Sequence, residues 1–237
     1  MISLGRTKKP SRKKEQEFSL VERYQELREA GNLPTQAWAQ LKSDYITQFR
    51  QRTTSGDAEQ SWKSASGKAF EDIVWQEFSS QCQGLKNLQV AQWHELPDSL
   101  RKPLSEQLWV RGEIKPVEAE SNVDFVAYEI DDNAPKRIIA VYSCKVSLRE
   151  RFQQDLFWAD RLRGRGIRFC FITLDNDNVL TKATITGDLT SKQASMSVAV
   201  YDRIYLFRSE SEIQHYTRVF RTVDCLGEDL KRWLELD

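Results

Sequence analysis

The chain has few of the residues that build disulfide frameworks, zinc sites and phosphate-binding loops. Its 237 residues include four cysteines and two histidines, and none of them lies at a zinc-ligand spacing. Ten glycines occur, but neither GxGxxG nor GxxxxGK[ST] is present, so nothing supports a nucleotide-binding fold. No apolar stretch follows the charged first residues, so we expect no secretion signal and a cytoplasmic protein with unpaired cysteines.

Long apolar runs and net charge are also missing. No window approaches the roughly 18 consecutive apolar residues of a membrane span, so no membrane-spanning helix is expected. Lys plus Arg and Asp plus Glu both number 35, and this zero net charge excludes a uniformly basic nucleic-acid binder. The charges are unevenly placed, however. Residues 113–132 carry one basic and seven acidic side chains, whereas residues 145–168 carry seven basic and three acidic ones.

Periodicity and composition divide the chain into three predicted parts. Residues 1–17 form a flexible basic arm, because six of the nine residues from Arg6 to Lys14 are basic and none is apolar. This arm is either a solvated tail or a segment that holds phosphates. Residues 18–60 are predicted to form an N-terminal helical subdomain, since Ser19 and Glu22 make a capping box and apolar residues then recur at helical spacing. Residues 61–237 form the core domain.

The core domain is predicted to be a mixed α/β sheet flanked by helices. Strands are predicted at residues 88–92, 108–110, 123–130, 137–143, 167–174 and 198–207. Helices are predicted at about 62–82, 148–162 and 209–220 and in the tail at 227–237. Because the turn at residues 131–135 joins two strands into a hairpin, the sheet cannot be all parallel.

Two residues of this hairpin suit the hydrolysis of a phosphodiester. Asp124 lies in an apolar strand, and Lys145 ends the next strand, 21 residues later. Strands of this length joined by one turn place both side chains at the same end of the hairpin. A carboxylate there can hold a divalent cation, and an ammonium group can stabilise the charge on the phosphate or orient the attacking water.

Three charged residues follow the lysine at the predicted start of a helix. They are Arg149, Glu150 and Arg151. Arginine fits the O6 and N7 atoms of guanine in the major groove, and glutamate accepts a hydrogen bond from the N4 amino group of cytosine. An R-E-R sequence can therefore read consecutive G·C pairs, although without the preceding lysine it is more typical of a helix start with internal salt bridges.

Taken together, these residues resemble a known family. The run from Ser143 to Arg151, read as S-C-K-x-x-x-R-E-R, with Asp124 upstream and a glutamate-bearing helix before it, is similar to the type II restriction endonucleases of the PD-(D/E)XK fold. The resemblance is with the branch that recognises CCGG, CCNGG or CCWGG, to which EcoRII, PspGI and NgoMIV belong. It covers roughly residues 68–166.

The resemblance implies a metal site and a cofactor, Mg²⁺. Asp124 would be the central metal ligand, Lys145 the catalytic lysine, and Glu71 a further catalytic acid and metal ligand from the preceding helix. About thirteen residues past the lysine, where this branch carries a glutamate, the chain has Trp158. Asp155 is rotated by about 60° from that position on a helix and is the expected replacement metal ligand.

The resemblance also implies the substrate and the assembly. We expect Mg²⁺-dependent hydrolysis of double-stranded DNA at a short palindromic G/C-rich site, CCNGG-like or CCGG-containing, with Arg149, Glu150 and Arg151 reading the G·C pairs. A palindromic site needs a two-fold symmetric reader, so a homodimer is expected. Two alternatives stay open: a repair or recombination nuclease of the same fold, and a DNA-binding module that has lost catalysis, for which Trp158 would account.

Overall fold

The computed structural model describes residues 18–53, 55–147, 152–186, 189, 191–209, 213 and 218–236. Its strands are β1 (Leu88–Gln92), β2 (Ser105–Val110), β3 (Glu113–Glu118), β4 (Phe125–Asp131), β5 (Ala134–Lys145), β6 (Arg168–Thr173), β7 (Arg203–Leu206) and β8 (Phe220–Thr222). Its helices are α1 (Leu20–Glu29), α2 (Pro34–Arg52), α3 (Ala58–Cys82), α4 (Asp98–Arg101), α5 (Phe152–Arg163), α6 (Val179–Thr186), α7 (Lys192–Val200) and α8 (Leu226–Leu236).

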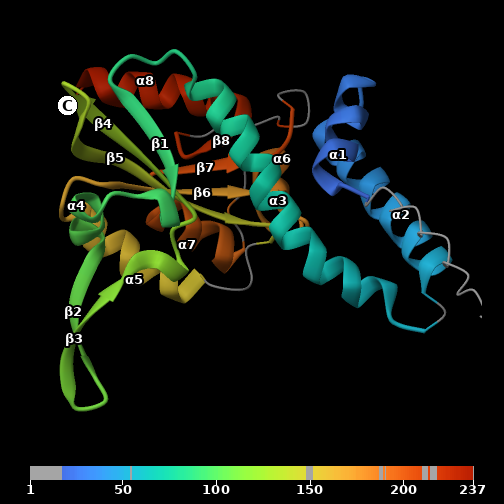
Figure 1. The fold of residues 1–237 in the computed structure, drawn as a ribbon, viewed down its shortest axis with the longest axis horizontal. Helices are drawn as coiled ribbons and strands as arrows, with labels where there is room; N and C mark the ends of the chain where they lie inside the picture. Colours follow the sequence, from blue (N-terminus) through green and yellow to red (C-terminus); the bar gives the residue numbers. More distant parts are fainter. Residues whose placement is uncertain are drawn as a thin grey trace, which may run out of the picture.

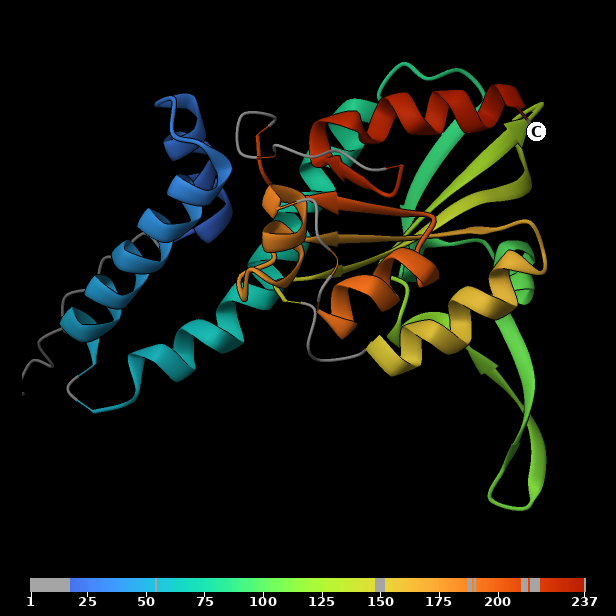
Figure 2. The ribbon, with the colours of Figure 1, turned by 180° about the vertical axis from the view of Figure 1, so that it is seen from behind.

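A six-stranded mixed sheet forms the body of the protein, in the order β1-β4-β5-β6-β7-β8. The pairs β1–β4 and β4–β5 are antiparallel, and the strands from β5 to β8 run parallel. Helices α3 and α8 cover one face of the sheet and α5 and α7 the other (Figures 1 and 2). The predicted α/β architecture, with a hairpin that breaks the parallel pattern, is confirmed.

The N-terminal helices pack against α3. The predicted cap of α1 is present, because Ser19 Oγ accepts a hydrogen bond from the Glu22 N–H at 3.3 Å. In α2, Trp38 contacts two aromatic rings of α3, with ring centroids 5.4 Å from Trp62 and 5.7 Å from Phe70. Helix α3 runs unbroken through residue 60, so the proposed end of the subdomain falls inside one continuous helix.

Two element predictions at the C-terminal end are wrong. The strand predicted at residues 198–207 is a helix up to Val200, and only Arg203–Leu206 forms a strand. Ser191 Oγ caps α7 by accepting from the Ala194 N–H at 3.0 Å, and a short apolar run fits either element. The helix predicted at 209–220 fails at its end, because Phe220 pairs with Ile204 in the sheet. Residues 210–212 and 214–217 lie outside the described part of the chain.

A separate hairpin, β2–β3, projects from the body (Figure 1). Its turn is Arg111-Gly112, with φ angles of 50° and 86°, and sequence reasoning predicted only residues 108–110 of it. Trp109 and Ile114 face each other across the strands and expose 73% and 67% of their surface. None of the helices in the described ranges combines the length and apolarity that crossing a bilayer requires.

Candidate active site

The predicted aspartate and lysine meet at one edge of the sheet, where β4 begins and β5 ends. Asp124 directly precedes β4, and its N–H donates to the Tyr142 carbonyl at 2.8 Å, so the backbone ladder extends through it. Lys145 is the last residue of β5. Its Nζ lies 2.8 Å from Asp124 Oδ2 and 3.2 Å from Oδ1. The hairpin therefore brings both side chains to the same end.

The Asp124 carboxylate is held from two sides. Besides Lys145, the backbone N–H of Cys144 donates to Oδ2 at 2.6 Å. Burial lowers the pKa of Lys145, but the charge and hydrogen bonds of Asp124 outweigh it and the pKa is raised overall. Lys145 is therefore a protonated ammonium group with a fixed orientation.

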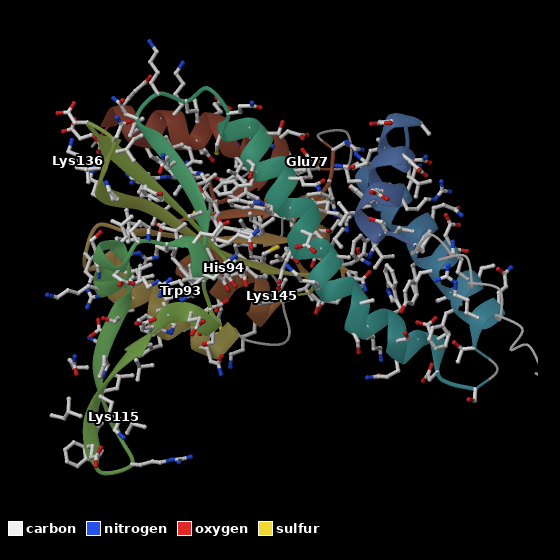
Figure 3. All side chains as sticks on the ribbon, viewed as in Figure 1. Glu77, Trp93, His94, Lys115, Lys136 and Lys145 are labelled. Carbon is white, nitrogen blue, oxygen red and sulfur yellow. The ribbon has the colours of Figure 1, made fainter. Side chains whose placement is uncertain are left out.

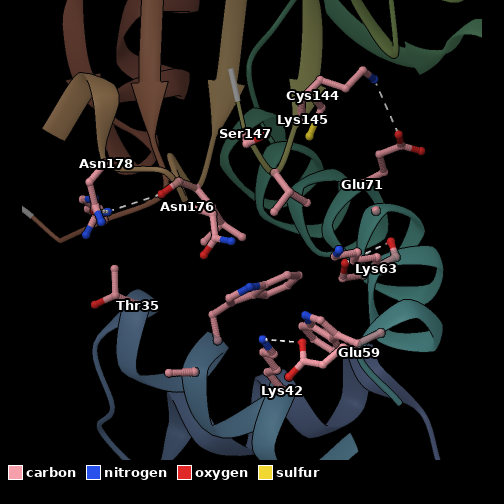
Figure 4. Close-up of a pocket in the computed structure, with 18 residues that line it drawn as sticks. Thr35, Lys42, Glu59, Lys63, Glu71, Cys144, Lys145, Ser147, Asn176 and Asn178 are labelled. Carbon is pink, nitrogen blue, oxygen red and sulfur yellow. Dashed lines mark hydrogen bonds and ion pairs between the residues drawn. The ribbon is translucent and has the colours of Figure 1, made fainter. Parts of the chain in front are cut away.

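Glu71 reaches the same ammonium group from α3. Its Oε1 lies 3.7 Å from Lys145 Nζ, and Figure 4 shows the two side chains facing each other. The pKa of Glu71 is raised, first by burial and then by the charge of Asp124, while Lys145 and Lys68 oppose the shift. Two carboxylates thus share one lysine, and the charge of Asp124 disfavours the ionised form of Glu71.

Asp155 lies in α5 and is almost fully buried, with 2% of its surface exposed. Its Oδ1 accepts from Asn122 Nδ2 and its Oδ2 from the Tyr201 hydroxyl, both at 2.7 Å. Burial raises its pKa, and these two hydrogen bonds together with the charge of Lys145 oppose the rise. Asp155 therefore lies close enough to feel the charges of Lys145 and Asp124, while its carboxylate oxygens accept hydrogen bonds from Asn122 and Tyr201.

Sequence reasoning missed Asn122 and Tyr201. Asn122 is two residues before Asp124, and this closeness is the only signal that the sequence offers for it. Tyr201 is 46 residues from Asp155 and follows a helix that had been predicted as a strand, so no pattern points to it. The prediction that Trp158 belongs to the core is confirmed, because 4% of it is exposed among apolar neighbours.

The proposed readers of DNA sequence are not part of the described structure. Arg149, Glu150 and Arg151 lie outside the described residues, as does the basic arm at residues 1–17. In the sequence they lie between the end of β5 at Lys145 and the start of α5 at Phe152.

Two concavities flank the charged cluster. One, of about 660 Å³, opens between α2, α3 and the ends of β5 and β6, and its lining includes Trp38, Trp62, Lys63, Lys145 and Asn176 (Figure 4). The other, of about 320 Å³, includes Lys68, Gln92, Trp93, His94 and Asp124 in its lining. Glu71 lines both concavities. A substrate bound in either one would therefore contact the cluster of Glu71, Asp124 and Lys145.

The donor set of this edge fits a divalent cation. Within the described residues, no group of three or more His, Cys, Asp and Glu side chains is arranged as a metal site. Asp124 and Glu71 nevertheless offer carboxylate oxygens, which Mg²⁺ prefers. The charge of Asp124 contributes to the raised pKa of Glu71, and a cation held by these residues would offset that repulsion.

Comparison with known families decides the class of the protein. The model of the BsaWI restriction endonuclease type 2 family matches residues 102–231. The chain belongs to this family. The matched range contains Asp124, Lys145 and Asp155, whereas Glu71 lies before it. Family membership makes the protein a type II restriction endonuclease, a site-specific deoxyribonuclease.

Two solved structures are similar to this member of the BsaWI family. The pre-specific complex of restriction endonuclease BsaWI with DNA is 13% identical, with 92% of this chain and 90% of that chain covered and a TM-score of 0.49. The specific complex of restriction endonuclease AgeI with DNA is 16% identical, with 81% and 74% covered and a TM-score of 0.49. No curated protein matches the chain.

Proposed function

We propose that this endonuclease is Mg²⁺-dependent and cuts both strands of a short palindromic G/C-rich site in double-stranded DNA. The observation that carries the proposal is the position of Lys145 between two carboxylates, 2.8 Å from Asp124 and 3.7 Å from Glu71. A cation site next to a fixed ammonium group is what phosphodiester hydrolysis requires.

The metal would be held by Asp124 and Glu71, with Asp155 as the third acid from α5. When bound, Mg²⁺ would neutralise charge on the phosphate and acidify a water molecule. The protein's own groups have separate roles. The Cys144 N–H fixes the Asp124 carboxylate, and Lys145 donates a proton of its ammonium group in a hydrogen bond to the attacked phosphate or to the attacking water.

Asn122 and Tyr201 would hold the third acid in position. Each donates one hydrogen bond to Asp155, so the two carboxylate oxygens have fixed directions before any substrate arrives. Preorganised ligands of this kind reduce the rearrangement that binding of a cation requires.

Sequence recognition is assigned to the segment that follows Lys145. Arg149, Glu150 and Arg151 would read the G·C pairs of a CCNGG-like or CCGG-containing site, since arginine pairs with guanine and glutamate with cytosine. The protein would then belong to the branch that includes EcoRII, PspGI and NgoMIV. A homodimer would match the two-fold symmetry of such a site.

The domain division is part of the same proposal. Residues 1–17 would form a basic arm, residues 18–60 a helical subdomain and residues 61–237 the endonuclease core. The packing of α1 and α2 on α3 supports a helical unit that borders the larger of the two concavities.

A plasmid digest tests the proposal. Purified protein is incubated with unmethylated plasmid DNA in Mg²⁺ or in EDTA, and the ends of any fragments are sequenced. Discrete fragments with one common G/C-rich palindrome, in Mg²⁺ only, are expected. Random degradation, cleavage in EDTA, or an intact plasmid over a full range of salt concentrations would each refute it.

A further inference from the structure

A third concavity, lined by charged side chains, lies away from the Asp124–Lys145 pair. It measures about 600 Å³ and is lined by five arginines from five places in the chain. We call this group the arginine pocket: Arg163, Arg168, Arg203, Arg218 and Arg232.

The arginine pocket and Lys145 are at opposite ends of the strands of the sheet. In the parallel pair β5–β6, Lys145 is level with Thr173, and Arg168 begins β6 five residues earlier. At about 3.3 Å per residue, the two ends are roughly 17 Å apart. Figure 3 shows the direction of β5, with Lys136 near its start and Lys145 at its end.

Three of the arginines are held in place by the protein. The guanidinium carbons of Arg168 and Arg203 lie 5.1 Å and 5.6 Å from the ring centroid of Trp233. Arg203 Nε also lies 3.0 Å from Asp229 Oδ2, and Arg163 donates to the Val200 carbonyl at 2.7 Å. Their planar donor groups are thus oriented without any ligand.

The pocket carries excess positive charge. Two carboxylates accompany the five arginines: Asp202, which accepts from the Phe169 N–H at 2.9 Å, and Asp229. Among the described residues, this group holds five positive and two negative side chains. Arg218 and Arg232 are exposed, and no ion pair formed within the described part of the chain includes either of them. Five guanidinium groups in one concavity repel one another unless an anion accompanies them.

We propose that the arginine pocket binds the phosphate backbone of a DNA segment other than the one in the active site. Guanidinium groups match phosphate oxygens in geometry and charge. A duplex at the Lys145 end of the strands would have to fold back across the sheet to reach the arginine pocket, and so sharp a bend in duplex DNA is costly in free energy. The inference rests on DNA as the substrate of the family and not on the roles proposed for the catalytic residues.

Binding stoichiometry tests the inference. The full-length protein is kept in EDTA, so that no cleavage occurs, and is titrated with a 16-base-pair A·T duplex under native mass spectrometry. The wild type should bind more duplexes per protein than the variant Arg218→Ala/Arg232→Ala. The variant should lose the weaker binding step, with affinity falling about tenfold for each arginine.

A second pair of variants separates a specific pocket from general charge. Lys86→Ala/Lys102→Ala removes the same charge from two exposed lysines elsewhere and should bind as the wild type does. Arg218→Lys/Arg232→Lys keeps the charge, so this variant should retain part of the weaker DNA-binding step that the alanine variant loses. Because Arg218 and Arg232 are exposed, these variants should fold normally, and thermal unfolding checks that they do.

Chemical protection identifies the ligand independently of stoichiometry. Modification by phenylglyoxal, followed by peptide mass mapping, should show Arg218 and Arg232 protected by the duplex. Protection by inorganic phosphate but not by the duplex would overturn the inference. So would equal stoichiometry in the wild type and the arginine variant, even if plasmid cleavage proceeds normally. Because EDTA prevents catalysis in these assays, a failure of the proposed cleavage reaction would not imitate either result.

Discussion

The Nζ atom of Lys145 lies 2.8 Å from Oδ2 of Asp124 and 3.7 Å from Oε1 of Glu71, so one ammonium group links a hairpin and a helix. Its positive charge lowers the pKa of Glu71, against the burial and the charge of Asp124 that raise it. Removal of any of the three groups therefore changes the electrostatics of the other two.

Replacement of the lysine should abolish cleavage and spare DNA binding. Lys145→Ala removes the ammonium group next to the attacked phosphate, and we expect kcat to fall by about 10² to 10³-fold or more. Single-turnover digestion measures the rate, and a gel-shift assay measures binding. Lys136→Ala is the matched control, since Lys136 is in the same strand but pairs with Glu129 at 2.7 Å. Equal rates for both variants would exclude a catalytic role for Lys145.

Replacement of the helical glutamate should weaken the response to Mg²⁺. Glu71→Gln keeps the shape but removes a proposed ligand charge, so the Mg²⁺ concentration for half-maximal cleavage should rise by about tenfold or more. The variant also relieves repulsion with Asp124, so its melting temperature should match or exceed that of the wild type. Glu77→Gln is the control, because Glu77 is in the same helix and burial also raises its pKa. An unchanged Mg²⁺ titration for Glu71→Gln would remove it from the metal site.

The buried aspartate should leave a signature in the pH dependence of stability. The pKa of Asp155 is raised above its ordinary value of 3.8, so near and above that value the folded state holds a proton that the unfolded state has released. Its contribution to stability therefore falls as the pH rises from 3.8 through the raised pKa, and Asp155→Asn should remove this fall. Urea unfolding at several acidic pH values measures it.

Asp160→Asn serves as the control for the buried aspartate. Asp160 lies in the same helix but is exposed, so its replacement should leave the pH dependence unchanged. If the free energy of unfolding changed with pH equally in the wild type and in Asp155→Asn, the effect assigned to the burial of Asp155 would be contradicted. Cleavage by Asp155→Asn should also fall if Asp155 is the third metal ligand.

The recognition arginines should show their role as a loss of discrimination. Arg149→Ala or Arg151→Ala should cost about 1–3 kcal/mol of discrimination at one base pair, while other positions of the site stay selective. Competition binding against single-base-pair variants of the site measures this. A uniform loss of affinity across all sequences would mean that the residue touches only the phosphate backbone.

Local patterns predicted the hairpin that carries Asp124 and Lys145, because strand periodicity on both sides of a turn fixes which ends meet. The prediction that Glu71 lies near Lys145 depended on the family resemblance. Helical spacing shows which residues share a face of the helix, but not which strand that face covers. Asn122 had only its closeness to Asp124 as a signal and Tyr201 had none, because their hydrogen bonds to Asp155 join segments distant in sequence. The arginine pocket likewise collects residues from 163 to 232.

Helix α3 holds Glu71 between two remote attachments. At its N-terminal half Trp62 packs against Trp38, and at its C-terminal end Gln81 accepts from the Gly227 N–H at 3.1 Å and donates to the Val223 carbonyl at 3.0 Å. A Cβ at Gly227 would lie 2.9 Å from the Gln81 carbonyl oxygen, so only glycine allows this approach. A substitution at Gly227 would push on one end of a rigid rod about 37 Å long and shift the catalytic carboxylate without touching the active site.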